Sequence, residues 1–243
     1  MKPPPVTEHD SADAAATRSP LPVAFISDLT CPWCAIGLTA LERAIEQLAD
    51  ELPVALQLQP FELNPDIPFE GEPIADYAAR KYGASAGQLA ERQAQIRQRA
   101  GALGLNFRLR THVYNTFDAH RLLRWAALQG RQLELKRALL RAYHERGENL
   151  ASPDVLLAAA AEAGLDRLAA GDVLGRATHA DDVRITVRRW QRLGIDGVPA
   201  MVIDGRHLVA GAQPVEAYVQ SLREAAAHGR QSQAAPSASA ARA

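Results

Sequence analysis

Cysteine is scarce in this chain: only two of its 243 residues are cysteines, and no second C-x-x-C or H-x₃₋₅-H pair accompanies them. A structural zinc site would need about four Cys or His ligands, so we expect no metal site. The chain also lacks an excess of charge of either sign, because 27 Lys and Arg balance 28 Asp and Glu. A net charge of −1 does not suggest a nucleic-acid partner.

Long hydrophobic runs are absent as well. No stretch approaches the ~20 apolar residues that a membrane span requires. Residues 1–20 are rich in Pro, Ala and acidic residues, and they contain no apolar segment followed by a cleavage site. We therefore expect no membrane association and a cytoplasmic location. The composition predicts disorder at both ends, over residues 1–20 and over the low-complexity tail 228–243.

The two cysteines form the motif Cys31-Pro32-Trp33-Cys34 at the expected start of a helix. There, Cys31 would meet unpaired N–H groups and the positive end of the helix dipole, which favour its thiolate. Pro32 is compatible with a first helical turn. Cys34 would lie one turn later, where it could attack a mixed disulfide on Cys31. The spacing predicts a dithiol that opens and closes, with only Cys31 exposed.

Two other interpretations of the cysteines carry less weight. A structural disulfide would close too short a loop to constrain the unfolded chain much. Inert buried thiols would not require the strand–turn–helix context in which the pair occurs.

The hydrophobic pattern predicts an α/β fold in the order βαβ…αββα. A strand over 23–26, an amphipathic helix behind the cysteines and an alternating strand over 53–61 form a βαβ unit. Strand signals then vanish over 73–178, which we interpret as an all-helical subdomain inserted between segments 21–72 and 179–227. The predicted helices of the insertion cover residues 74–82, 86–103, 119–127, 133–146, 153–163 and 169–177. The predicted elements after it are a helix over 181–193, strands over 200–204 and 207–210, and a helix over 214–226.

Pro199 stands directly before a strand that should be central in the sheet. Proline cannot donate to a strand ladder, so its position demands an edge, a bulge or a cis peptide bond. We predict a cis Val198–Pro199 bond in a loop that faces the dithiol. Such a loop would leave the backbone N–H and C=O of Val198 free to pair with an extended substrate.

These features together resemble the DsbA family of thiol-disulfide oxidoreductases, and more narrowly its FrnE-type branch. The residues that carry the resemblance are Asp28 before CPWC, Ile36-Gly37, Phe61-Glu62-Leu63-Asn64-Pro65, Asn115-Thr116-Phe117-Asp118-Ala119-His120-Arg121-Leu122, Gly197-Val198-Pro199 and Gly211-Ala212-Gln213. The resemblance implies a thioredoxin-like fold with a helical insertion, a nucleophilic Cys31, a resolving Cys34 and a cis Pro199. It also implies a disulfide- or thiol-containing substrate and a recycling reductant or oxidant. No resident cofactor is implied, with glutathione only as an alternative co-substrate.

The chain departs from its relatives at two positions near the cysteines. Phe25 stands where many thioredoxin-fold enzymes carry an acidic residue behind the second cysteine, so Asp28 and water are the available substitutes for its proton relay. Trp33 stands where strongly oxidising relatives carry histidine. We therefore expect a less oxidising dithiol than in those relatives.

Two other functions stay open at this point. Kappa-class glutathione transferases and hydroxychromene carboxylate isomerases share the implied fold, but they use serine at the position of Cys31 and commonly an acidic residue near Gly211. A redox-controlled ligand-binding protein is the third hypothesis. The chain would act as a monomer or a homodimer.

Three further residues are candidates for substrate contact. Trp33 lies between the cysteines and could touch the substrate or pack locally. By resemblance the insertion faces the active cleft, which makes Asn115 and His120 candidates. Alternatively, Asn115 caps a helix and His120 packs in the interior or points to solvent.

Overall fold

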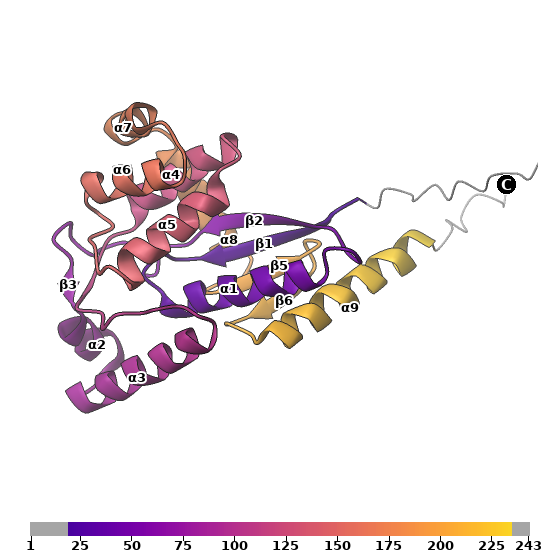
Figure 1. Cartoon of the computed structure of the whole chain (residues 1–243), viewed down its shortest axis with the longest axis horizontal. Helices are drawn as coiled ribbons and strands as arrows, with labels where there is room; N and C mark the ends of the chain where they lie inside the picture. The colour runs from indigo at the N-terminus through magenta and orange to yellow at the C-terminus, as the bar shows by residue number, and fades with distance from the viewer. Residues whose placement is uncertain (1–18, 235–243) are drawn as a thin grey trace, which may run out of the picture.

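The computed structural model describes residues 19–234, which form a four-stranded sheet, a two-stranded sheet and the helices around them (Figure 1). The larger sheet has the order β2-β1-β5-β6, in which β2 runs parallel to β1 while β5 and β6 are antiparallel neighbours. Its strands are β1 (Leu21–Ser27), β2 (Val54–Pro60), β5 (Ala200–Ile203) and β6 (His207–Ala210). The helices are α1 (Pro32–Gln47), α2 (Ile74–Tyr82), α3 (Ala86–Ala102), α4 (Phe117–Leu128), α5 (Gln132–His144), α6 (Pro153–Glu162), α7 (Arg167–Gly175), α8 (Ala180–Arg192) and α9 (Val215–Ala234).

Alternating residues of β1 point to the two faces of this sheet, as the period of two in a strand requires. Val23 and Phe25 belong to the large hydrophobic cluster that also contains buried residues of α1 and α9. Ile26 belongs to a smaller cluster with Trp190 of α8. Helices α1 and α9 lie side by side and cover one face of the sheet (Figure 1). Helix α8 lies at the other face.

The helices between β2 and α8 gather at the end of the sheet where β1 and β2 terminate (Figure 1). Because the carboxyl ends of these two parallel strands meet there, the loops that follow them lie between the sheet and the insertion. The large cluster continues from the sheet into α4, α5, α6 and α7, and includes Leu122, Leu139 and Leu156. The insertion therefore shares one core with the sheet.

The α/β class and the βαβ…αββα order predicted from the sequence are confirmed. Two expectations were wrong. The insertion is not all-helical, because β3 (Glu72–Pro73) pairs with β4 (His112–Val113) in an antiparallel ladder too short to give a periodic signal. The tail expected from residue 228 also starts too early, since α9 continues to Ala234. The disorder expected for residues 1–18 and 235–243 lies outside the described residues.

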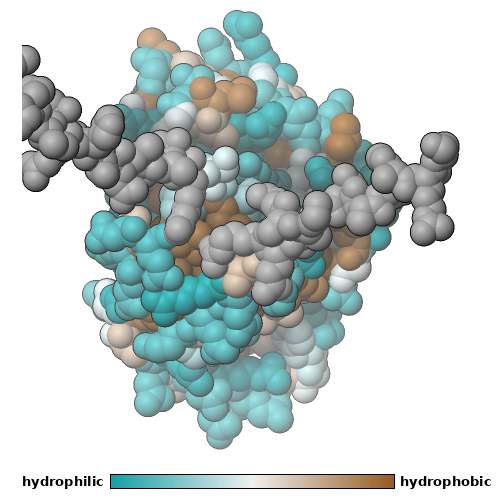
Figure 2. All heavy atoms as spheres, turned by 90° about the vertical axis from the view of Figure 1, so that its right-hand side faces the viewer, coloured by the Kyte–Doolittle hydropathy of each residue, from teal (hydrophilic) through white to brown (hydrophobic). Residues whose placement is uncertain are grey.

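Within residues 19–234, no helix combines the length and hydrophobicity that crossing a membrane would require. Figure 2 views the molecule from the end of the sheet opposite the insertion. The surface on this face is mostly hydrophilic, with some hydrophobic surface near its centre.

Helix α4 offers a direct test of where the core lies. Leu122 is completely buried and Leu128, six residues later on the same helix, is 59% exposed. We expect Leu122→Ala to lower the free energy of unfolding by about 2–5 kcal/mol, because it removes buried methyl groups and leaves a cavity. Leu128→Ala should change it by less than about 0.5 kcal/mol. Urea unfolding of both variants measures the difference, and equal effects would contradict this packing.

Candidate active site

The dithiol lies at the start of α1, which begins at Pro32 with Cys31 as its N-cap residue. The backbone of Cys31 is extended, with φ −81° and ψ 113°, and its carbonyl accepts hydrogen bonds from the N–H groups of Cys34 (3.1 Å) and Ala35 (3.4 Å). The missing N–H of Pro32 costs nothing at this position. The Sγ of Cys31 is therefore held at the amino end of α1, where the helix dipole favours negative charge.

Burial separates the two thiols, though not as expected. Cys31 was predicted to be exposed, but it is only 6% exposed, and Cys34 is completely buried. Cys31 instead borders a cavity of about 200 Å³ that opens at the surface, and Cys34 is not among the residues that line it. Reagents can thus reach the first sulfur through this cleft and not the second.

The two cysteines are free thiols whose pKa values diverge. The thiol of Cys34 donates a hydrogen bond to the sulfur of Cys31, and this bond is the main reason that the pKa of Cys31 is lowered in spite of burial. Backbone N–H groups of Cys34 and Trp33 contribute in the same direction. Burial, followed by the same thiol–thiol hydrogen bond, raises the pKa of Cys34 well above its ordinary value. The predicted direction for Cys31 is confirmed, but its main cause is the second cysteine and not the helix end alone.

The loop before β5 packs against the helix that carries the cysteines. The Val198–Pro199 peptide bond is cis, as expected, and the carbonyl oxygen of Val198 lies 3.8 Å from the Sγ of Cys31. Gly37 allows the close approach of α1, because a Cβ atom there would lie 3.3 Å from Cγ of Pro199 and 3.2 Å from the hydroxyl of Tyr218. The sequence thus correctly predicted that this loop faces the dithiol.

A buried carboxylate lies behind the dithiol. Asp28 is 1% exposed and accepts hydrogen bonds from the N–H of Leu29 (2.6 Å), the N–H of Leu63 (2.8 Å) and the hydroxyl of Thr116 (2.8 Å). The Nε2 of His120 lies 3.5 Å from its Oδ1. Burial by itself would raise the pKa of Asp28, but His120 and these donors together lower it. Burial is also the main reason that the pKa of His120 is lowered.

Lys136 of α5 is a functional candidate that the sequence analysis missed. Its side chain is 1% exposed, and burial lowers its pKa to about 8. The nearby charges of Cys34, Asp28 and Cys31 act in the opposite direction, in that order. The ammonium in turn lowers the pKa of Cys34, against the larger effect of burial. The signal in the sequence was a lysine on the apolar face of a helix, three and four residues before Leu139 and Leu140.

Glu62, in the loop after β2, is a second acid near Asp28. Burial, followed by the charge of Asp28, raises the pKa of Glu62 to about 7, and Arg184 acts against this. In the sequence, Glu62 was noted only as part of the motif that carries the family resemblance. A single glutamate in a loop belongs to no periodic pattern that would mark it as functional.

The cleft above Cys31 has mainly apolar walls from α2, α3 and the start of α1. Trp33 is 38% exposed and forms part of its wall, together with Tyr77 and Tyr82, whose hydroxyls lie 3.4 Å apart. Arg92 and Arg110 are its two basic residues. The cleft can therefore accept an apolar side chain next to a sulfur at Cys31.

The other two residues expected to touch substrate lie elsewhere. Asn115 donates its amide to the carbonyl of Pro65 (3.0 Å) and accepts from the N–H of Phe117 (2.9 Å), so it ties two loops together at the start of α4. His120 is 2% exposed beside Asp28. Neither lines the cleft over Cys31; Val198 and Pro199 do not line it either, but the carbonyl of Val198 lies against the Sγ of Cys31. Among residues 19–234, no group of three or more His, Cys, Asp or Glu side chains could hold a metal ion.

Comparisons with known proteins show the family and the fold of this chain. The model of the DSBA-like thioredoxin domain family matches residues 22–223. The structure of a probable DsbA oxidoreductase from Streptomyces coelicolor is 33% identical, with a TM-score of 0.81 over 85% of this chain and 90% of that one. The cytosolic disulfide reductase DsbM from Pseudomonas aeruginosa, at 22% identity, has a TM-score of 0.55 over 88% of this chain and all of that one. The uncharacterized protein YwbO from Bacillus subtilis is 25% identical over 202 residues, which are 82% of this chain and 94% of that protein.

The thiol–thiol hydrogen bond predicts how the pKa of Cys31 responds to substitutions of its partner. Cys34→Ser keeps a hydroxyl donor, whereas Cys34→Ala removes the donor. We expect the pKa of Cys31 to be higher in Cys34→Ala than in Cys34→Ser, as measured by thiolate absorbance near 240 nm or by the pH dependence of alkylation. Equal values would assign the shift to the helix end alone.

The same shift predicts a pH dependence of stability. A thiol whose pKa is lowered in the folded state stabilises that state above its unfolded pKa of about 8.5, and the effect is lost as pH falls through the folded pKa. The free energy of unfolding of Cys34→Ser should therefore be compared with that of the variant with serine at both positions. The difference should grow as pH rises from the folded to the unfolded pKa of Cys31, and it should be constant above the unfolded pKa. Each unit of lowering corresponds to about 1.4 kcal/mol. A flat difference across this pH range would contradict an activated Cys31.

Proposed function

Because the chain belongs to the family of DSBA-like thioredoxin domains, we propose that it is a thiol:disulfide oxidoreductase or isomerase that reacts through Cys31 and Cys34. The observation that carries the proposal is the division between the two thiols. One has a lowered pKa and borders a cleft, while the other has a raised pKa and is sealed behind it. This is the arrangement that ordered thiol–disulfide exchange requires.

In the first step, the thiolate of Cys31 attacks one sulfur of a substrate disulfide in the cleft. A new S–S bond forms between Cys31 and that sulfur, the substrate S–S bond breaks, and the other substrate sulfur leaves as a thiolate. Until then, Cys34 stabilises the nucleophile by donating its S–H, and its own raised pKa keeps it protonated. The pair therefore presents one nucleophile at a time.

The second step follows from the loss of charge on Cys31. Once Cys31 is in a mixed disulfide, its negative charge no longer raises the pKa of Cys34, and the hydrogen bond between them is released. The ammonium of Lys136 still favours the Cys34 thiolate. That thiolate attacks the sulfur of Cys31, closes the Cys31–Cys34 disulfide and releases the substrate as a second thiol. A recycling reductant then restores the dithiol, or an oxidant reverses the direction.

The substrate in this proposal carries an apolar group next to its disulfide or thiol. The apolar walls of the cleft support this, and they suit a peptide as well as a small molecule. We assign substrate contact to Trp33 and to the Val198–Pro199 loop. Asn115 and His120, given their positions, would act through the loops and through Asp28 rather than by touching substrate.

Several finer assignments belong to the same proposal. Membership of the FrnE-type branch rests on the motif residues quoted above. A cytoplasmic location is supported by the structural neighbour DsbM, which is described as a cytosolic reductase. We propose no resident cofactor, metal, nucleic-acid or membrane partner, and a monomer or homodimer.

A glutathione-dependent reaction is the second candidate, and one feature of the cleft favours it. Arg92 and Arg110 could bind the carboxylates of glutathione while its sulfur pairs with Cys31. Against it, Gln213 stands where related transferases commonly place an acid, and its amide donates to the carbonyl of Ala210 (2.8 Å). A redox-controlled binding protein is the third candidate.

Substitution of each cysteine tests the ordered mechanism. We expect Cys31→Ser to abolish the reduction of insulin disulfides, because the reachable nucleophile is lost. Cys34→Ser should keep the first step and accumulate mixed disulfides, because the attack that resolves them is lost. Mass spectrometry of the trapped species, together with alkylation rates of the two thiols, measures both outcomes. Mixed disulfides on Cys34 in the Cys31→Ser variant would reverse the assignment.

Three assays on the unmodified protein separate the candidate functions. Turnover of insulin with a thiol reductant supports the oxidoreductase. Conjugation of chlorodinitrobenzene with glutathione, without insulin turnover, would replace it by the transferase. Ligand binding that depends on redox state, with neither activity, would replace both by the binding protein.

A further inference from the structure

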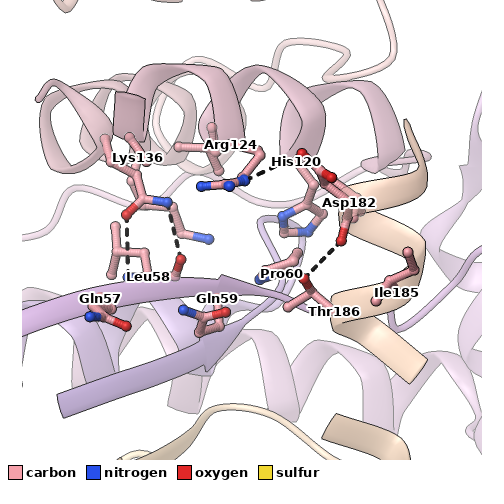
Figure 3. A pocket seen from close by; sticks show the side chains of 14 residues that line it. Gln57, Leu58, Gln59, Pro60, His120, Arg124, Lys136, Asp182, Ile185 and Thr186 are labelled. Carbon is pink, nitrogen blue, oxygen red and sulfur yellow. Dashed lines mark hydrogen bonds and ion pairs between the residues drawn. The ribbon is translucent and has the colours of Figure 1, made fainter. Parts of the chain in front are cut away.

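A second and larger cavity lies between the edge strand β2 and helices α4, α5 and α8 (Figure 3). Its volume is about 430 Å³, which is in the range of sites for small molecules. None of the residues that line it also lines the cleft over Cys31. It is therefore separate from the surface through which the proposed reaction takes place.

The cavity contains a buried cation that the protein leaves without a direct partner. Lys136 lines it, although the residue is only 1% exposed. Among the described residues, none of the hydrogen bonds or ion pairs involves its ammonium group. Because Lys136 borders the cavity, an anion in this space would meet an ammonium that no protein acceptor occupies.

The other titratable groups of the cavity leave its charge positive. Arg124 and His120 point into the same space as Lys136 (Figure 3). The one acid in the lining, Asp182, is shared by the Nε of Arg124 at 3.6 Å and the Nδ1 of His179 at 2.8 Å. Lys136 also interacts with the charges of Asp28 and the two cysteines, none of which lines the cavity. The acid at the mouth thus pairs with Arg124, whereas Lys136 makes no ion pair among the described residues and only feels the buried charges near the dithiol.

Uncharged groups complete the lining. In the part of the chain that the structure describes, the side-chain amides of Gln57 and Gln59 make no hydrogen bond, and both line the cavity. Gln132 is already used, because its amide bonds both the N–H and the C=O of Leu58 on the open edge of β2 (3.3 and 3.1 Å). Apolar walls come from Leu58, Leu123 and Ile185.

We infer that this cavity binds a small aliphatic carboxylate, with its anionic group on the ammonium of Lys136 and its polar or apolar remainder between Gln59 and Arg124. A single carboxylate matches the net charge of the lining, in which Lys136 and Arg124 are opposed by Asp182 alone. A phosphate dianion would bring a second negative charge that the lining does not balance. The pKa of Lys136, which burial lowers to about 8, leaves the group mostly protonated near pH 7.

The site would also sense the state of the dithiol, and this second part rests on the proposed function. Lys136 interacts with the charges of Cys34 and Cys31, so a thiolate and a bound carboxylate compete for one ammonium. The disulfide form carries no thiolate and should bind the carboxylate more tightly. By reciprocity, the bound carboxylate favours the oxidised pair and lowers its reduction potential.

Calorimetric titration of the oxidised full chain with propionate, butyrate and inorganic phosphate tests the site, each against sodium chloride at matched ionic strength. We expect saturable binding of the carboxylates and weaker binding of phosphate. Lys136→Met should weaken carboxylate binding at least tenfold, and Arg124→Gln about threefold. Arg137→Gln is the matched control, because it removes a positive charge from the same helix at a residue that pairs with Glu42 outside the cavity. It should bind as the unmodified chain does.

Three results would overturn the inference: no saturable binding, phosphate binding tighter than carboxylate, or equal affinities in all three variants. If Lys136→Met does not fold, the half-exposed Arg124 still decides the matter, because Arg124→Gln and Arg137→Gln should then differ.

The redox part has its own readout. The dissociation constant should be at least threefold larger for the reduced chain, and each tenfold preference corresponds to about 30 mV in the potential of the pair. Equal affinity of the oxidised and reduced forms would contradict the redox coupling, but it would not contradict the carboxylate site. If the chain binds carboxylates but does not reduce insulin, the carboxylate site is supported and the proposed function is overturned.

Discussion

The burial of one carboxylate, that of Asp28, is the constraint on which much of this structure depends. A charged group in the interior is tolerated only where donors surround it. Those donors come from the loop after β1, from the loop after β2 and from the start of α4, through Leu29, Leu63 and Thr116. The requirement to satisfy Asp28 therefore joins the sheet to the insertion directly behind the cysteines.

The same carboxylate also acts on the dithiol. Its negative charge opposes a thiolate on Cys31, so the pKa of Cys31 is lowered against Asp28 and burial, mainly by the S–H of Cys34. Lys136 offsets part of this negative charge from the other side, and it favours a thiolate on Cys34. Charges of both signs thus act on one another between Cys31, which borders the cleft, and Lys136, which borders the larger cavity. A change in charge at one end acts on the groups at the other, because Asp28, Lys136 and both cysteines are buried and buried charges are screened less than exposed ones.

The insertion contributes more than a wall to the cleft. Helix α5 carries Lys136 toward the cysteines and Gln132 onto the open edge of β2, where its amide takes the place of a further strand. Edge strands expose unpaired N–H and C=O groups, and natural proteins cover them. The larger cavity lies where α4, α5 and α8 approach this edge without filling the space above it. The packing of these helices against β2 therefore both covers the edge of the sheet and forms the cavity.

The sequence by itself determined the elements and the reactive motif. Periodicity located the main strands and helices within a few residues, and the spacing of Cys31 and Cys34, with Pro199 before β5, indicated the dithiol and the cis loop. These signals are local, since they depend on period, caps and turns within a few residues. The two-residue strands β3 and β4 were missed, because two residues are too few to show the alternation of apolar and polar residues that is typical of a strand. The extension of α9 to Ala234 was missed as well, because its composition resembles that of a disordered tail.

Only the tertiary structure decided which polar groups meet. Nothing local brings Lys136 beside Cys34, more than a hundred residues away in the chain, or ties Thr116 to Asp28. The same holds for Asn115, which the sequence could place at a helix start but not outside the cleft, and for Cys31, whose motif could not show that it is nearly buried. Burial and charge depend on neighbours from other elements, and those neighbours are set when the insertion packs against the end of the sheet.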